Sequence, residues 1–339
     1  MTRTLPRAKN DSEVVVVTGA SAGLGRAIVR EFACHGAMLG LIARDQDRLD
    51  ATAREVEESG GRAISIVADV AKADDLERAA DEVESKLGPI DIWVNNAMVT
   101  VFGPFHDVQH DEYRRATEVT YLGQVWGTMA ALKRMRARNR GHIVQVGSAL
   151  AYRSIPLQSV YCGAKHAIKG FTDSIRCELI HERSKVRLTM VQMPAMNTPQ
   201  FDWCRSHLAR HPQPVPPIYN PEIGAKAVYW AAHHDRRELK VGASTVATVL
   251  GQKIAPGLLD LYLGRTGYSS QQTNKHVEPG RSDNLFGPVP GDYAAHGSFD
   301  ERAANSSAEL WFGTHRAVSA GAAILLGAVF FGGLRLLSR

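Results

Sequence analysis

Tyr161 and Lys165 stand four residues apart in a stretch with helical periodicity. Residues with this spacing share one face of a helix, so the hydroxyl and the ammonium point into one space. A tyrosine with its usual pKa of about 10 is a weak acid/base at neutral pH, and a neighbouring cation stabilises the phenolate. The pair therefore predicts a general acid/base at Tyr161, with Lys165 lowering its pKa.

Two surface residues can share this spacing without any function, so the surroundings decide its meaning. Ser148 lies just past an apolar run, 142–147, that reads as a strand. A hydroxyl at a strand end can hold a substrate oxygen, and parallel strands present their ligands at this end. Ser148 is therefore predicted to act together with Tyr161.

The stretch 18–25, with the sequence TGASAGLG, follows a β-branched run and precedes a helical one. Its glycines permit a tight turn, and the helix start offers N–H donors to a pyrophosphate. A strand before the glycines and a helix after them is the context that makes this pattern specific. We expect a dinucleotide to be held there by Gly19, Ser21, Gly23, Leu24 and Gly25.

The end of the second predicted strand decides the preference between the two nicotinamide cofactors. A basic residue there accommodates the 2′-phosphate of NADP, and an acidic one binds the ribose hydroxyl of NAD. Arg44 favours NADP, whereas a shifted register would place Asp45 near the ribose. NADP is the predicted cofactor and NAD the alternative.

Six apolar runs alternate with helical segments along the first two thirds of the chain. This alternation predicts an α/β fold, a doubly wound parallel sheet of the Rossmann type. Beyond it, a proline-rich stretch, 211–221, is expected to be loop, 221–234 a helix, and 264–297 an extended tail. The predicted division is an N-terminal tail at 1–12, a catalytic domain at 13–250, an extension at 251–312 and a hydrophobic C-terminal helix at 313–339.

The chain has 339 residues with a net charge of +5. The basic run 133–140 follows an apolar helical stretch and is better explained as a solvated helix end than as a nucleic-acid site. No metal spacing occurs among the four cysteines, which fit reduced thiols, and the polar N-terminus has no signal core. These features favour a cytoplasmic protein. The uncharged stretch 317–334 could associate with a membrane or be buried in a subunit interface.

The glycine loop, Ser148 and the Tyr161/Lys165 pair resemble the short-chain dehydrogenase/reductase family over residues 13–234. The resemblance implies that Tyr161 exchanges a proton with an alcohol or carbonyl substrate, while Ser148 orients its oxygen. It implies that Lys165 also binds the nicotinamide ribose, that hydride passes to or from the nicotinamide, and that the chain forms an oligomer. Further cofactor contacts are implied at Asp69, Val70, Asn96, Ala97, Pro194 and Thr198.

Three positions depart from the family pattern. Met98 replaces the last glycine of NNAG, and the loop 193–198 lacks its usual glycine. Thr120 stands where the family has a helix asparagine near a proton-relay water, so Thr120 is predicted to serve the relay in altered form. These departures permit an alternative function, an inactive dinucleotide-binding scaffold or redox sensor.

The stretch 199–211 corresponds to the family's substrate lid. Its apolar side chains predict an apolar substrate, unless they only pack the lid onto the core. The residues concerned are Phe201, Trp203, Cys204 and Leu208, together with Met193, Met196 and Phe102.

Overall fold

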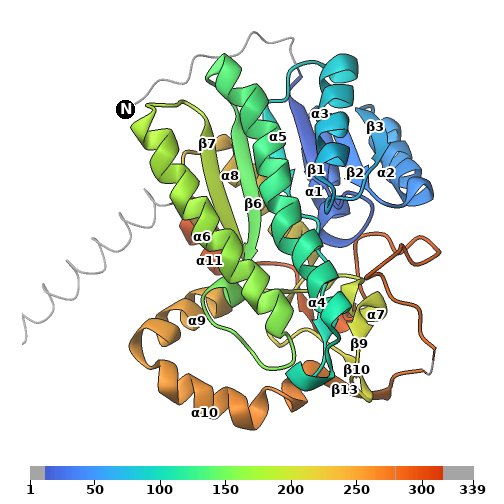
Figure 1. Cartoon of the computed structure of the whole chain (residues 1–339), viewed down its shortest axis with the longest axis vertical. Coiled ribbons are helices and arrows are strands. Elements are labelled where there is room, and N and C mark those ends of the chain that lie inside the picture. Colours follow the sequence, from blue (N-terminus) through green and yellow to red (C-terminus); the bar gives the residue numbers. More distant parts are fainter. Residues whose placement is uncertain (1–11, 279, 316–339) are drawn as a thin grey trace, which may run out of the picture.

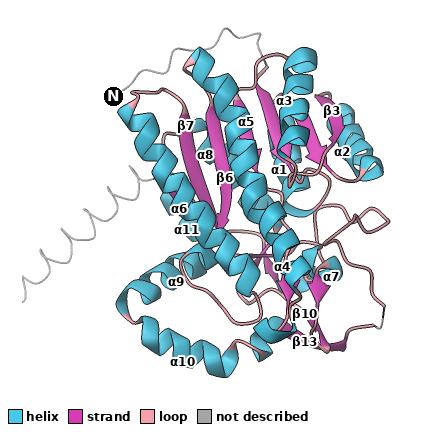
Figure 2. Cartoon of the chain, in the orientation of Figure 1, coloured by secondary structure: helices cyan, strands magenta, loops and turns pink. Residues whose placement is uncertain are grey.

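The computed structural model describes residues 12–278 and 280–315. Seven parallel strands form its central sheet in the order β12-β7-β6-β4-β1-β2-β3 (Figures 1 and 2). Six of these strands match the predicted runs, whereas β12 was not predicted because only three residues form it. The strands are β1 Val14–Thr18, β2 Met38–Ala43, β3 Arg62–Val67, β4 Ile92–Asn95, β6 His142–Ser148, β7 Arg187–Met193 and β12 Glu238–Lys240.

Helices cover both faces of the sheet, which confirms the predicted doubly wound fold. Side chains alternate along each strand, so Val15 and Val17 of β1 join one core, while Val14 and Val16 join the other. The first core lies under α1 Gly23–Cys34, α2 Gln46–Glu58 and α8 Pro221–His233. The second lies under α3 Ala73–Leu87, α5 Gly123–Arg138 and α6 Ser159–His181, which stand in front of the sheet in Figure 1.

The helical region predicted over 111–138 is interrupted. It divides into α4 His110–Thr117, a π-helical turn η2 Glu118–Leu122, and α5. The basic run at the end of α5 makes ion pairs with acidic side chains. Arg134 pairs with Glu77, Arg138 with Glu84 and Arg136 with Glu182.

The C-terminal third is more ordered than the sequence predicted. The expected loop 211–221 contributes to two short strands, β10 Arg210–Pro212 and β11 Ile218–Tyr219. The expected extended tail at 264–297 is also wrong, because β13 Gln272–His276 pairs with β10 and Leu285 is fully buried. The predicted domain boundary at 250/251 falls inside α9 Ala243–Ile254, which is followed by α10 Pro256–Thr266.

Short elements complete the part of the chain that the structure describes. They are β5 Val101–Phe102, η1 Phe105–Asp107, η3 Ala149–Ala151, β8 Ala195–Met196, α7 Gln200–Trp203, β9 Arg205–Ser206, η4 Ser269–Gln271, η5 Asp300–Arg302, β14 Ala303–Ala304 and α11 Ala308–Thr314. The predicted hydrophobic stretch 317–334 lies outside the described residues. Among the helices in 12–278 and 280–315, none is long and apolar enough to cross a membrane.

Candidate active site

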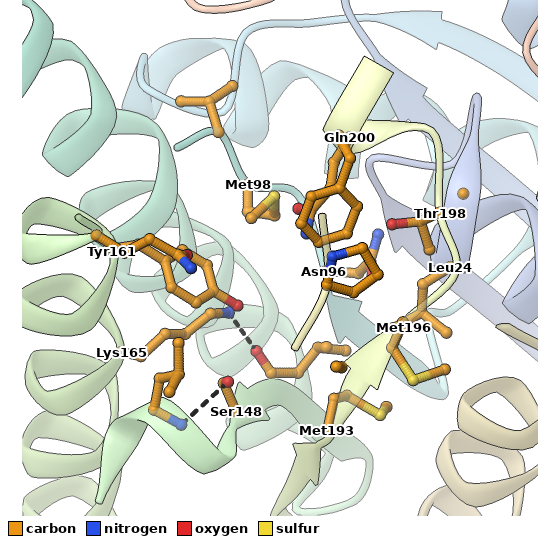
Figure 3. A pocket seen from close by; sticks show the side chains of 18 of the residues that line it. Leu24, Asn96, Met98, Ser148, Tyr161, Lys165, Met193, Met196, Thr198 and Gln200 are labelled. Atoms are coloured by element: carbon orange, nitrogen blue, oxygen red, sulfur yellow. Dashed lines mark hydrogen bonds between the residues drawn. The ribbon is translucent and has the colours of Figure 1, made fainter. Parts of the chain in front are cut away.

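A cavity of about 520 Å³ opens at the carboxyl ends of the sheet strands. Every predicted cofactor-binding residue lines it, and so do Ser148, Tyr161 and Lys165; Thr120 does not. Figure 3 shows the catalytic candidates on one side of the cavity, with Leu24, Met196 and Thr198 facing them. The structure therefore brings together residues that lie up to 179 positions apart in the sequence, from Gly19 to Thr198.

The glycine loop needs its glycines for geometric reasons. Gly19 and Gly23 have φ angles of +67° and +56°, a region that side chains with a Cβ disfavour. A Cβ on Gly25 would lie 1.9 Å from the carbonyl oxygen of Gly19. Asn96 braces this turn, because its amide nitrogen donates to the carbonyl oxygen of Thr18 at 3.0 Å. All three glycines line the cavity.

Ser148, Tyr161 and Lys165 come from two neighbouring elements. Ser148 is the last residue of β6, and its hydroxyl accepts from the Leu150 N–H at 3.1 Å. Ser148 and Tyr161 line the same side of the cavity (Figure 3). The Lys165 ammonium lies 5.4 Å from the centre of the Tyr161 ring, on the same face of α6. Lys165 also donates to the Val146 carbonyl oxygen at 2.7 Å, a contact that no sequence pattern indicated.

Burial dominates the electrostatics of this group. It raises the pKa of the Tyr161 hydroxyl well above its usual value, and the nearby Ser148 hydroxyl opposes this effect. Burial lowers the pKa of Lys165 to about 7, because an ammonium that is 1% exposed loses its hydration. The prediction that Lys165 lowers the pKa of Tyr161 is therefore not confirmed, because burial raises that pKa. Burial shifts both groups toward their neutral forms.

Thr120 sits in the π-helical turn and is fully buried. Its hydroxyl donates to the Val99 carbonyl oxygen at 2.7 Å and accepts from the Val99 N–H at 3.1 Å. These bonds use the hydroxyl to fix the segment that follows Met98. The structure thus gives the Thr120 hydroxyl two contacts with the Val99 backbone.

The opposite end of the cavity is rich in arginine. Arg48 bonds to Asp45 at 3.0 Å, and Arg115 bonds to Asp69 at 2.6 Å. Arg44 instead donates to two backbone carbonyl oxygens, those of Asn284 and Leu285, and within the described residues it has no carboxylate partner. Burial, and then repulsion from Arg115 and Arg48, lowers its pKa.

The Asp45 carboxylate is already bound by groups of the protein itself. Its carboxylate caps α2 by accepting from the Arg48 N–H at 2.9 Å, and it also holds the Arg48 guanidinium. The Arg48 Nε is buried and has no hydrogen-bond partner among the described residues. An excess of positive charge therefore remains at this end of the cavity.

The third part of the cavity lies between η3, α9 and α10. Its walls combine aliphatic side chains with a few amides and hydroxyls. They include Leu150, Ile155, Val215, Leu259 and Leu263, together with Gln158, Gln213, Ser244, Thr248 and Gln271. Gln271 is fixed, since its amide donates to the carbonyl oxygens of Pro156 and Gly267 at 2.8 and 2.6 Å.

The predicted lid residues divide into two groups. Phe201, Trp203, Met193 and Met196 line the cavity. The other three are buried in a small separate core and do not line it: Phe102, Cys204 and Leu208. The α9–α10 wall was not predicted: no motif marks it, and its leucines Leu259 and Leu263 lie in the stretch assigned to the extension.

Comparison with known proteins agrees with this geometry. The family model described as short chain dehydrogenase matches residues 13–207. An uncharacterised oxidoreductase of Bacillus subtilis is 34% identical over 280 residues, which cover 82% of this chain and 79% of that protein. A 3-dehydrosphinganine reductase of Danio rerio is 33% identical over 55% of this chain and 57% of its own length.

Solved structures show the same relationship. An alcohol dehydrogenase from Thermococcus sibiricus, complexed with 5-hydroxy-NADP, is 27% identical with a TM-score of 0.58, covering 68% of this chain and 95% of that one. A metagenomic short-chain oxidoreductase in complex with NADP is 29% identical with a TM-score of 0.57, covering 68% and 96%. The chain belongs to the short chain dehydrogenase family of oxidoreductases.

Proposed function

We propose that this protein is an NADP(H)-dependent oxidoreductase that interconverts an alcohol and a carbonyl group on an apolar small molecule. The observation that carries the proposal is the convergence of Ser148, Tyr161 and Lys165 with the glycine loop on one cavity. When bound, the nicotinamide supplies the hydride chemistry. The chain's own residues supply binding, orientation and the proton.

Tyr161 is the proposed proton donor in the direction of carbonyl reduction. Its raised pKa keeps the hydroxyl protonated at neutral pH, which is the form that a general acid needs. Ser148, which lines the same side of the cavity, would hold the carbonyl oxygen and stabilise its developing charge. Lys165, held by the Val146 carbonyl, stands behind Tyr161 as the group that takes part in replacing the donated proton.

The residues at the arginine-rich end fit a 2′-phosphate. Among the residues that the structure describes, Arg44 carries a charge without a carboxylate partner, and Arg48 keeps a buried N–H without an acceptor. A phosphate offers acceptor oxygens and negative charge to both. This chemistry supports NADP over NAD, and the two NADP-type complexes among the related structures agree with it.

The walls formed by α9, α10 and η3 support an apolar substrate. Aliphatic side chains such as Leu150, Leu259 and Leu263 line this part, and a few fixed polar groups such as Gln271 can set orientation. For the segment 317–334 we propose membrane association, on the ground that it carries no charged residue. Oligomer formation is also proposed, by resemblance to the family alone.

The test is a screen of carbonyls with NADPH, and of alcohols with NADP⁺, using purified wild-type protein and Tyr161→Phe. Tyr152→Phe is the matched control, because the Tyr152 hydroxyl binds Glu238 at 2.5 Å and does not line the cavity. We expect Tyr161→Phe to lose at least about 100-fold in kcat, the range of a general acid, while Tyr152→Phe stays active. Wild-type protein that binds NADPH yet is as inert as Tyr161→Phe would point to the scaffold or redox sensor instead.

A further inference from the structure

Residues 281–300, called the strap here, follow β13 and run past the cavity without a regular strand or a helix longer than one turn. In Figure 1 this segment, orange to red, lies beside α7 at the lower end of the sheet. It falls beyond the stretch that matches the family model, 13–207. Two of its residues, Asn284 and Pro288, line the same cavity as the glycine loop.

The first residues of the strap form hydrogen bonds with α7 and the residue after it. The Arg281 guanidinium donates to the carbonyl oxygens of Phe201 and Cys204 at 3.0 and 2.5 Å. The Asn284 N–H donates to the Trp203 carbonyl oxygen at 2.9 Å. Further along, the rings of Tyr293 and Trp203 meet edge to face, with centroids 4.6 Å apart.

The same part of the strap also forms hydrogen bonds with the arginine-rich end of the cavity. The carbonyl oxygen of Asn284 accepts from Arg44 at 2.5 Å. The carbonyl oxygen of Leu285 accepts from both Arg44 and Arg115, at 3.3 and 3.2 Å. The Leu285 side chain is fully buried in the core that also contains Val70. The strap therefore bridges the two walls where the arginine-rich end of the cavity lies.

Its second half closes on the glycine loop itself. The N–H of Gly23 donates to the Ala294 carbonyl oxygen at 2.9 Å. Arg26, only 3% exposed in α1, forms ion pairs with Asp292 and, at 2.7 Å, with Glu55. The side chain of Asp292 is 48% exposed, so this pair lies at the boundary between the core and solvent.

We infer that the strap is a second, previously unassigned part of the cofactor site, which covers the 2′-phosphoadenosine portion of NADP(H) and must detach before the cofactor exchanges. This inference rests on the proposed function, because it takes the cavity to be a dinucleotide site. A ligand seated between Arg44 and Gly23 lies under a segment bonded to both residues. Leu285 and Ala295 anchor the strap in the core, whereas its ion pair with Arg26 is made by the half-exposed Asp292 carboxylate. The part of the strap around Asp292 can therefore open at lower cost than the packed core.

The test measures NADPH release from the full chain by stopped-flow fluorescence with an NADP⁺ chase. Asp292→Asn removes the charge that faces Arg26 and keeps the side-chain size. Glu182→Gln is the control, because it removes a comparable pair with Arg136, 2.6 Å long, at the far end of α6. We expect Asp292→Asn to release NADPH at least tenfold faster than wild type, and Glu182→Gln to match wild type.

Hydrogen exchange on the wild-type chain provides a second readout that needs no variant. Amides within 281–300 are expected to exchange at least tenfold more slowly with NADPH bound, and to slow less with NADH at equal saturation. NADPH release rates of Asp292→Asn within twofold of wild type, or equal hydrogen exchange with and without NADPH, would contradict the inferred role of the strap. Neither result would contradict the proposed function. A wild-type chain that binds no NADPH would overturn the proposed function itself.

Discussion

Replacing Lys165 with methionine is expected to stabilise the fold while it removes activity. Lys165 is 1% exposed, and burial lowers its pKa from 10.5 to about 7. Folding must therefore strip a proton from a lysine that is charged in the unfolded chain. Each pKa unit corresponds to about 1.4 kcal/mol, so the cost is about 4 kcal/mol at pH 7 and about 2 kcal/mol at pH 9.

The sign of this effect follows from proton counting. Between pH 7 and 10.5 the unfolded chain binds more protons at this position than the folded chain, so wild-type stability rises with pH through that window. The cost is complete below pH 7 and vanishes above 10.5. Methionine does not titrate, so the stability advantage of Lys165→Met should shrink by about 2 kcal/mol between pH 7 and pH 9.

The lost hydrogen bond subtracts little from this gain. The Val146 carbonyl oxygen accepts from Lys165 at 2.7 Å and also from the Gln124 side chain at 3.2 Å, so it keeps a donor in the variant. Urea unfolding of the cofactor-free full chain at pH 7 and pH 9 measures the difference. Lys169→Met is the control: it removes a partly exposed pair with Asp173 and should change stability by less than about 1 kcal/mol.

Two results would refute the reasoning. One is a Lys165→Met protein that is less stable than wild type at pH 7. The other is a stability advantage of the same size at both pH values, because burial of a titrating ammonium would then not be its cause.

Three other predictions concern the cofactor, the proton and the tail. Arg44→Ala should weaken NADPH binding at least tenfold more than NADH binding by fluorescence titration, since its charge has no carboxylate partner in 12–278 and 280–315; equal losses would contradict a role of Arg44 in binding the 2′-phosphate. Alcohol oxidation should speed up by close to tenfold per pH unit from pH 7 to 9, because the raised pKa of Tyr161 makes its basic form scarce, whereas a flat pH profile in steady-state assays would assign the base elsewhere. Deletion of 317–339 should move the protein from the membrane to the soluble fraction, and a full chain found wholly soluble without detergent contradicts the anchor.

Much of the fold could be predicted from local sequence signals. The strands β1 to β4, β6 and β7 of the central sheet are short apolar runs, and α2 begins directly after Asp45, a capping residue whose side chain accepts from the Arg48 N–H. The glycine loop and the Ser148, Tyr161 and Lys165 set were located because each sits at the end of one element or on one helix face. Local rules of this kind predict where a residue lies along a strand or helix, but not how far its side chain is buried from water.

The remaining features depend on contacts between distant residues. The pKa directions of Tyr161 and Lys165 are set by burial, which their spacing does not encode. The strap has the Gly-, Ser- and Pro-rich composition of a tail, and its anchors are partners far back in the chain: Asp292 meets Arg26 across 266 positions. The contact of Thr120 with Val99 was not predicted either, since the π-helical turn that carries Thr120 has no simple sequence signature.

The order in which the chain is synthesised gives the strap a further consequence. All seven strands of the central sheet lie before residue 241, whereas the strap begins at residue 281. A ribosome that has reached residue 280 has therefore made the whole sheet, the glycine loop and Arg44, but not Asp292 or the carbonyls of Asn284 and Leu285 that engage them. During that interval the nascent chain presents an uncovered cofactor groove, so the first dinucleotide can be loaded before the strap exists.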